Sequence, residues 1–303
     1  MQELPLVSII IPTYNNNPVV CQAIDCSLNQ TYGNLEIIVV DDGSTDNTEQ
    51  LLNEKYKGRI IYVHQKNRGP GSARNTGIRH SSGKYVQFLD ADDLLDPDKI
   101  RIQITGLRKI SGKALSYCDY VRCDMDDVTV AYGRTSPVLQ NKSPFDDILM
   151  KWETQLCIPM HCFIFDAVFF KECGIAFDES LPANEDWECW MNIFALSPMV
   201  DFVDRVLASY RVRENSRCAD RLKMRNSHIM AIDMQIKKNR FKRDVVEKLE
   251  IRKKQIMHIY RDVRLMARII KVFPPVVKKL CSEIIPWRIQ KNFDLHECFM
   301  ARD

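Results

Sequence analysis

The stretch Ile37-Ile38-Val39-Val40-Asp41-Asp42-Gly43-Ser44 joins an apolar run to an acidic turn, and it decides the fold that we predict. A continuous run of β-branched residues is typical of a strand buried on both faces of a parallel sheet. A second stretch has the same order, because the largely apolar run Tyr85–Leu89 precedes Asp90-Ala91-Asp92-Asp93. Carboxylates that follow parallel strands stand where open α/β sheets bind ligands. We therefore expect an α/β protein with a ligand site at this edge.

The segments around these two stretches alternate between strand and helix patterns as far as about residue 110. Further strands are predicted at Val7–Ile11 and Ile60–Val63, and helices at 18–30, 44–57, 72–80 and after an N-cap at Asp96. This order predicts a doubly wound, mostly parallel sheet with flanking helices. Beyond it we expect strands at 114–122, 160–165 and 203–211, a helix at 184–196, and helices from 220 to 270.

Charge is unevenly distributed along the 303 residues, although the net charge is only +3. Residues 1–218 hold 22 basic and 30 acidic residues, whereas residues 219–303 hold 21 and 10. We expect a body at 1–218, with halves at 1–110 and 111–218, and a basic helical region at 219–303. An acidic body with a basic tail suggests that the tail faces something anionic.

The eleven cysteines contain no C-x-x-C pair and no zinc-ligand spacing, which favours free, buried thiols in a reducing cytosol. Neither a signal peptide nor a run of ~20 apolar residues is visible. We expect a cytoplasmic protein that either stays in solution or attaches peripherally to the inner face of the membrane.

The Asp90-Ala91-Asp92-Asp93 cluster has the chemistry of a metal-bound diphosphate site. The charge of a departing diphosphate must be neutralised, and Mg²⁺ or Mn²⁺ can neutralise it. Both ions prefer oxygen ligands such as carboxylates. One carboxylate of an Asp-x-Asp pair can hold the metal while the other reaches a ribose hydroxyl. The alternative is helix capping, but Asp96 is already available as the cap.

Other polar residues near the strand ends each have a functional and an ordinary interpretation. Asp42 can accept a base-edge donor such as the imide of uracil, or it can belong to a capped turn. Tyr14 can stack on a nucleobase, or it can simply pack. Arg74 lies near a helix start and suits a phosphate, or it is a surface cation. Asp186 can act as a general base, although acids in a first helical turn also stabilise the helix dipole.

In this order, the motifs resemble those of the family 2 glycosyltransferases with the GT-A fold. The resemblance covers residues 5 to 217 and is carried by Val7–Asn15, Gln30–Tyr32, Glu36–Asp46, Asn67–Gly69, Ala73–Gly77, Gly83–Asp93, Gly174–Glu179 and Glu185–Trp190. It implies a GT-A catalytic domain at 1–218, with a nucleotide-sugar-binding half at 1–110 and an acceptor-binding half at 111–218. It also implies sugar transfer from a nucleotide sugar with inversion at the anomeric carbon.

The resemblance also implies roles for individual residues. Asp186 would be the catalytic base, and Asp92 would ligate Mn²⁺ or Mg²⁺. The nucleotide would contact residues near the strand ends, namely Pro12, Thr13, Tyr14, Asp42, Arg74, Asp90 and Ala91. The chain departs from the family at Arg213, which stands where many relatives have a His after a Tyr-Arg pair. Arg213 can offer a cation to the diphosphate instead.

We therefore predict a metal-dependent, inverting glycosyltransferase that uses a UDP-linked sugar. The expected acceptor is a hydroxyl of a glycan or lipid-linked glycan in surface polysaccharide or glycolipid assembly. The main alternative is a catalytically inactive nucleotide-sugar-binding partner, although a binder has no need of a base at Asp186. A nucleotidyltransferase would need a Gly-rich loop that residues 12–17 lack. A nucleic-acid partner is not expected, because no aromatic-interleaved basic motif or zinc site occurs.

The C-terminal region interleaves basic and apolar residues at Lys237–Arg243, Arg261–Arg268 and Val276–Leu280. One interpretation is docking on an anionic membrane surface, where lipid-linked acceptors reside. The other is a helical cap on the catalytic domain whose charges are solvated.

Overall fold

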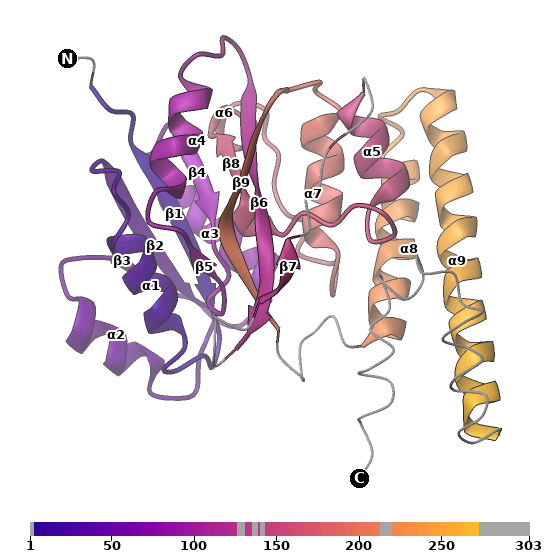
Figure 1. Ribbon diagram of the computed structural model, residues 1–303, viewed down its shortest axis with the longest axis horizontal. Coiled ribbons are helices and arrows are strands. Elements are labelled where there is room, and N and C mark those ends of the chain that lie inside the picture. The colour runs from indigo at the N-terminus through magenta and orange to yellow at the C-terminus, as the bar shows by residue number, and fades with distance from the viewer. Residues whose placement is uncertain (1–2, 126–130, 135–138, 140–142, 213–219, 273–303) are drawn as a thin grey trace.

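The computed structural model describes residues 3–125, 131–134, 139, 143–212 and 220–272. Within these residues, nine strands form one mixed sheet. Helices cover both faces of the sheet, and the last two helices stand side by side at one end of the molecule (Figure 1). The expected α/β fold with flanking helices and a helical C-terminal region is confirmed.

The first half of the sheet is parallel and is built from strand–helix–strand units. Its elements are β1 Val7–Thr13, α1 Val20–Leu28, β2 Leu35–Asp41, α2 Thr48–Tyr56, β3 Ile61–His64, α3 Pro70–His80 and β4 Tyr85–Phe88. Strand β1 lies between β2 and β4, and β2 pairs with β3. Thr13 is the register partner of Asp41, so β1 and β2 end at the same edge.

The second half of the sheet mixes strand directions. Its elements are β5 Leu94–Leu95, α4 Lys99–Leu107, β6 Ala114–Asp124, β7 Ala131–Arg134, β8 Phe163–Asp166, α6 Val168–Lys171 and β9 Met199–Val212. Strand β8 joins the halves, because it runs antiparallel to both β4 and β6. Strands β6 and β9 are parallel, whereas β5 is antiparallel to β9 and β7 to β6. The second half therefore combines one long parallel pair with several short antiparallel ones.

The core lies on both faces of the sheet, because successive side chains of a strand point in opposite directions. Ile9 and Ile11 of β1 belong to one buried cluster with residues of α1, α2 and α4. Ile10 belongs to the other, which includes residues of α3, α6 and two further helices, α5 Pro144–Lys151 and α7 Glu185–Phe194. The sheet is thus covered on both sides, as a parallel sheet requires.

The last two helices, α8 Arg221–Lys237 and α9 Arg243–Val272, pack on the layer of helices that contains α5 and α7. Ile232 of α8 and Leu249 of α9 are fully buried in the same cluster as Trp190 of α7. The described part of the basic C-terminal region therefore packs on the body as a helical cap. No helix in the described part of the chain is both long enough and apolar enough to span a membrane.

Three local predictions need correction. Asp96 is not the N-cap of α4, which begins at Lys99 after Asp98; the Asp96 carboxylate instead accepts the Asp98 N–H at 2.9 Å and stabilises the turn before the helix. The strand predicted from residue 160 begins at Phe163, because Met160–Cys162 form a 3-10 turn. The eight described cysteines are free, as expected, but Cys157 is exposed.

Candidate active site

The ends of β1, β2 and β4 meet at one edge of the sheet, and a polar segment follows each of them. Because β1 lies between β2 and β4, the strand order changes direction at β1. The crevice beyond such a point is the usual ligand position in open α/β sheets. Residues 12–15, 41–44 and 90–93 lie at or just beyond these strand ends. The predicted candidate residues from the first half therefore lie together.

Asp42 holds the loop that follows β3. Its carboxylate is nearly fully buried and accepts hydrogen bonds from the Gln65 side chain at 2.7 Å, from the Arg68 N–H at 3.0 Å and from the Gly69 N–H at 2.7 Å. Gly69 has a φ of 88°, a conformation that favours glycine. Asp42 is thus a structural acceptor whatever else it binds.

The end of β1 presents an exposed aromatic ring next to a buried strand end. Thr13 is 3% exposed, whereas Tyr14 is 47% exposed. The next residue, Asn15, ties this segment to the turn after β2, since its N–H donates to the Ser44 hydroxyl and its side-chain oxygen accepts the Thr45 N–H. An exposed ring on a tethered loop is suited to stacking against a planar ligand.

Arg74 joins the two halves of the site. Its side chain is 3% exposed, and its two terminal nitrogens lie 2.7 Å from Asp90 Oδ1 and 2.7 Å from Glu185 Oε1. Burial alone would lower the pKa of Arg74, but the carboxylates of Asp90 and Glu185 raise it above its ordinary value. The arginine is therefore a fixed cation between the segment after β4 and the first turn of α7.

The segment Asp92-Asp93 is held against β9. The Asp93 carboxylate accepts the Arg211 N–H at 2.8 Å, and its other oxygen lies 2.9 Å from His161 Nδ1. The Arg211 side chain also donates to the main-chain oxygen of Asp92. Burial would lower the pKa of His161, but the charge of Asp93 raises it. Asp92 itself stays partly exposed at the edge of the sheet.

Asp186 stands in the first turn of α7, next to Glu185. One oxygen of its carboxylate accepts the Trp187 N–H at 2.7 Å. Burial, followed by the negative charge of Glu185, raises the pKa of Asp186 to about 7. A carboxylate with a pKa near neutrality is a better proton acceptor than an ordinary aspartate, so Asp186 has the property that a general base needs.

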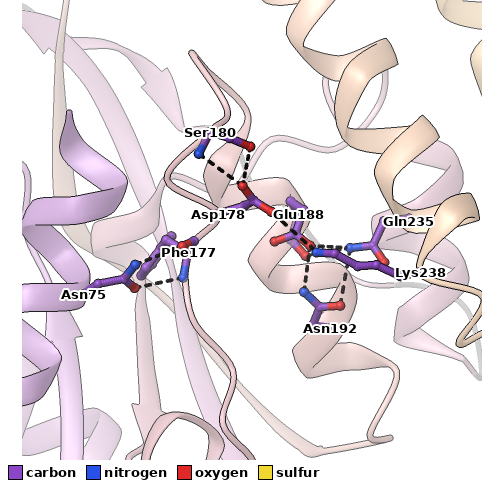
Figure 2. A network of polar contacts seen from close by, with 8 residues as sticks. All are labelled: Asn75, Phe177, Asp178, Ser180, Glu188, Asn192, Gln235 and Lys238. Atoms are coloured by element: carbon purple, nitrogen blue, oxygen red, sulfur yellow. Dashed lines mark hydrogen bonds and ion pairs between the residues drawn. The ribbon is translucent and has the colours of Figure 1, made fainter. Parts of the chain in front are cut away.

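The loop before α7 is fastened to α3 beside Arg74. Asn75 accepts the Phe177 N–H and donates to the Phe177 carbonyl, both at 2.9 Å (Figure 2). The Arg74 guanidinium lies 5.6 Å from the centre of the Phe177 ring. This pairing places α7 relative to the edge of the parallel half.

A divalent cation is compatible with the donor atoms at this edge. Among the described residues, no group of three or more His, Cys, Asp or Glu side chains has the geometry of a metal site. Mg²⁺ and Mn²⁺ are commonly held by one or two carboxylates together with phosphate oxygens of a substrate. Asp92 offers hard oxygen ligands next to Asp90, so the residues fit a cation that is shared with a diphosphate.

Sequence reasoning missed four residues that shape the site. In the sequence, Glu185 is an ordinary acid of a first helical turn, and Asp93 is one more acid of the cluster at 90–93. His161 has no metal-ligand spacing, and Arg211 is a cation at the end of a predicted strand that suits a diphosphate. Local sequence carries no signal for them, because each acts through a partner far away in the chain. Arg213, the predicted diphosphate cation, lies outside the described residues.

Comparison with known proteins identifies the family. The model for glycosyl transferase family 2 matches residues 8–174, more than half of the chain. The chain belongs to glycosyltransferase family 2. The matched region of this family 2 glycosyltransferase contains Asp42, Arg74, Asp90 and Asp92, whereas Glu185 and Asp186 follow it.

Relatives of this family 2 glycosyltransferase include an uncharacterized glycosyltransferase of Rickettsia typhi, 38% identical over 69% of this chain and 65% of the relative. Chondroitin synthase of Escherichia coli is 30% identical over 80% of this chain and 32% of the synthase. The chain spans between 28% and 65% of the length of five Rickettsia relatives.

Two solved structures share the fold of this family 2 glycosyltransferase. Staphylococcus aureus TarS 1-349 in complex with UDP-GlcNAc superposes with a TM-score of 0.60 at 19% identity, over 75% of this chain and 65% of that one. Mannosyltransferase PcManGT from Pyrobaculum calidifontis, in complex with GDP-Man and Mn²⁺, gives 0.59 at 19% identity, over 83% and 70%. These likenesses agree with the mixed α/β sheet described above.

Proposed function

We propose that this glycosyltransferase is a metal-dependent, inverting enzyme that transfers a sugar from a nucleotide sugar to a hydroxyl of a glycan or lipid-linked glycan. The observation that carries the proposal is the pair of ion contacts made by Arg74. Through them, Asp90 at the nucleotide edge is tied to Glu185, the neighbour of Asp186. The proposed diphosphate site and the proposed proton acceptor are thereby held at a fixed position relative to each other.

The proposed reaction is a single displacement. The acceptor oxygen forms a bond to the anomeric carbon while the bond from that carbon to the diphosphate breaks. Asp186 takes the proton of the attacking hydroxyl, which its pKa of about 7 favours near neutral pH. Attack from the face opposite the leaving group inverts the configuration. Arg74 keeps the base and the ribose-binding carboxylate of Asp90 in register.

Asp92 is the residue that would hold Mn²⁺ or Mg²⁺, and the metal would neutralise the departing nucleoside diphosphate. The Mn²⁺ complex of PcManGT supports a metal in a protein of this fold. Arg211 and Asp93 keep the main chain of Asp92 in place. The donor set therefore depends on contacts that reach from β9 and from His161.

The nucleoside is proposed to bind at Pro12, Thr13, Tyr14, Asp42 and Ala91. The exposed ring of Tyr14 is available to a base. A carboxylate can accept about four hydrogen bonds, and Asp42 uses three of them within the chain, which leaves one for an imide N–H. A uridine nucleotide offers that donor, and the UDP-GlcNAc complex of TarS supports this choice.

The acceptor is proposed to be a carbohydrate hydroxyl, and the similarity to chondroitin synthase supports a glycan acceptor. The division into residues 1–110, 111–218 and 219–303 remains a prediction. Cytoplasmic placement with peripheral attachment to a membrane also remains a prediction. Two lysines of the C-terminal region, Lys238 and Lys248, are already paired with Glu188 and Asp146 within the protein. Binding to liposomes with and without anionic lipid would test the attachment.

A catalytically inactive nucleotide-sugar-binding protein is the alternative. The raised pKa of Asp186 favours the enzyme, because a binder gains nothing from a poised base. The test is release of nucleoside diphosphate from a panel of nucleotide sugars with Mn²⁺, Mg²⁺ or EDTA. Metal-dependent release from one donor is expected. If no donor is consumed, even with lipid extract as acceptor, the binding protein becomes the better account.

A further inference from the structure

The first turn of α7 is held by a helix that lies beyond the region matched to the family. Asn184, which directly precedes Glu185 and Asp186, is the N-cap and has a φ of 58°. Asn tolerates this left-handed conformation better than most residues other than glycine, and neighbouring contacts fix it here. Helix α8 supplies such contacts at three successive points.

The first contact fixes the main chain at Ala183. The Ser227 hydroxyl accepts the Ala183 N–H at 3.0 Å and donates to the Ala183 carbonyl. Ser227 is 1% exposed, so no water competes for these hydrogen bonds. Both polar groups of the residue before Asn184 are therefore satisfied by one side chain of α8.

The second contact holds the residues that precede and follow the Glu185-Asp186 pair, namely Asn184 and Trp187. His228 is fully buried, and its Nδ1 lies 3.1 Å from Glu153 Oε2. The other oxygen of Glu153 accepts the Asn184 side-chain N–H at 2.7 Å. The His228 ring also packs on Trp187 with 4.6 Å between ring centres. One histidine thus steadies Asn184, through Glu153, and Trp187 directly.

The third contact holds the next residue of α7, Glu188, which is fully buried. Its Oε1 accepts from Gln235 at 2.7 Å and from Lys238 at 2.5 Å (Figure 2). Lys238 also lies 3.6 Å from Asp178, in the loop that Asn75 fastens to α3. Ser227, His228 and Gln235 lie on α8, and Lys238 is its C-cap. Their helical spacing places them on one face, toward the start of α7.

We propose that α8 is a positioning element for the base and that His228 is its central positioning residue. The inference rests on the proposed function, because it needs Asp186 to act as the base. Asp186 accepts the N–H of Trp187, so a shift of that residue moves the carboxylate. His228 touches no reacting atom in this account. It acts through Glu153, Asn184 and Trp187.

His228→Ala in the full chain tests the proposal. We expect kcat for sugar transfer to fall about 100-fold, a loss that a misplacement of about 1 Å can cause, while the Kd of the nucleotide donor changes less than about twofold. His228→Asn, whose amide can replace Nδ1 as a donor to Glu153, should recover most of the loss. Ser227→Ala, a milder change, should lower kcat about tenfold and serves if His228→Ala does not fold.

Leu249→Ala is the matched control, because Leu249 is fully buried on α9 of the same hairpin. It should lower the melting temperature as His228→Ala does and keep kcat. Equal losses of kcat in both variants, or full kcat in His228→Ala and Ser227→Ala, would overturn the positioning role. Asp186→Asn, assayed alongside, separates the two claims. If Asp186→Asn keeps turnover, the proposed function fails. If Asp186→Asn loses turnover while His228→Ala stays fully active, only the positioning role is refuted.

Discussion

Arg74 and Glu185 form a buried ion pair with 2.7 Å between nitrogen and oxygen, although 111 positions separate them in the sequence. The same guanidinium binds Asp90, so one side chain spans the junction between the parallel half of the sheet and α7. Removal of one partner from a buried ion pair leaves an uncompensated charge. The contact is therefore a structural requirement of this junction, and in the proposed reaction it also fixes the position of the helix that carries the base.

Arg74→Met should lower the free energy of unfolding by about 3–5 kcal/mol, because Asp90 and Glu185 would lose their shared cation. It should also lower kcat. Arg68→Ala is the control: Arg68 is half exposed and lies 3.9 Å from Glu179, so its loss should cost less than about 1 kcal/mol. Urea unfolding of both variants makes the comparison. Equal costs would refute the bridging role.

Transfer activity should rise as pH increases through about 7, because only the ionised form of Asp186 accepts a proton and burial raises its pKa to that value. Glu185 is the second cause of the raised pKa, so Glu185→Gln should move the rise in kcat to lower pH. Measurement of kcat between pH 5.5 and 8.5, roughly one and a half pH units on either side of that pKa, checks both. A rise that stays in place in Glu185→Gln would contradict this electrostatic account.

Lys99 should make stability increase with pH in the alkaline range. It is fully buried, and burial lowers its pKa from 10.5 to about 8. Between these values the unfolded chain binds the proton that the folded chain has released, so unfolding becomes less favourable as pH rises, by up to roughly 3 kcal/mol. Lys99→Met should remove this increase, whereas a change at exposed Lys113 should not. Urea titrations from pH 7.5 to 10.5, roughly that window, measure it.

Gly77 brings α3 close to β1. A Cβ at this position would lie 2.3 Å from Cγ2 of Ile10, a fully buried residue of β1. Gly77→Ala should therefore lower stability by about 1–3 kcal/mol through overpacking. A Cβ at Gly33 would meet no other atom within 4 Å, so Gly33→Ala should be close to neutral. Thermal melts measure both effects, and equal melting temperatures of the two variants would contradict overpacking at Gly77.

The sequence predicts the parallel half of the fold well, because a strand such as Ile37–Val40 is buried on both faces and reads as one apolar run. The edge position of Asp42, Asp90 and Asp92 follows directly. Cap chemistry was less reliable: Asp96 has the right residue type, yet Asp98 precedes the helix, since α4 begins only at Lys99.

The contacts that connect the halves could not be predicted. Glu185 looks like an ordinary first-turn acid, and only the structure shows that it pairs with Arg74. His161 and Asp93 are 68 positions apart, and His228 and Glu153 are 75 apart. Such pairs depend on how helices pack on the sheet, and packing leaves no periodic signal in a single sequence.

Asp186→Asn gives the most direct test of the central claim that this chain is an enzyme with Asp186 as its base. The change is nearly isosteric, keeps an oxygen that can accept the Trp187 N–H, and replaces the carboxylate that takes the proton by a neutral amide. The account predicts that the variant binds the nucleotide-sugar donor with the Kd of the wild type, while turnover falls by at least about 100-fold. Undiminished turnover with unchanged donor affinity would contradict it.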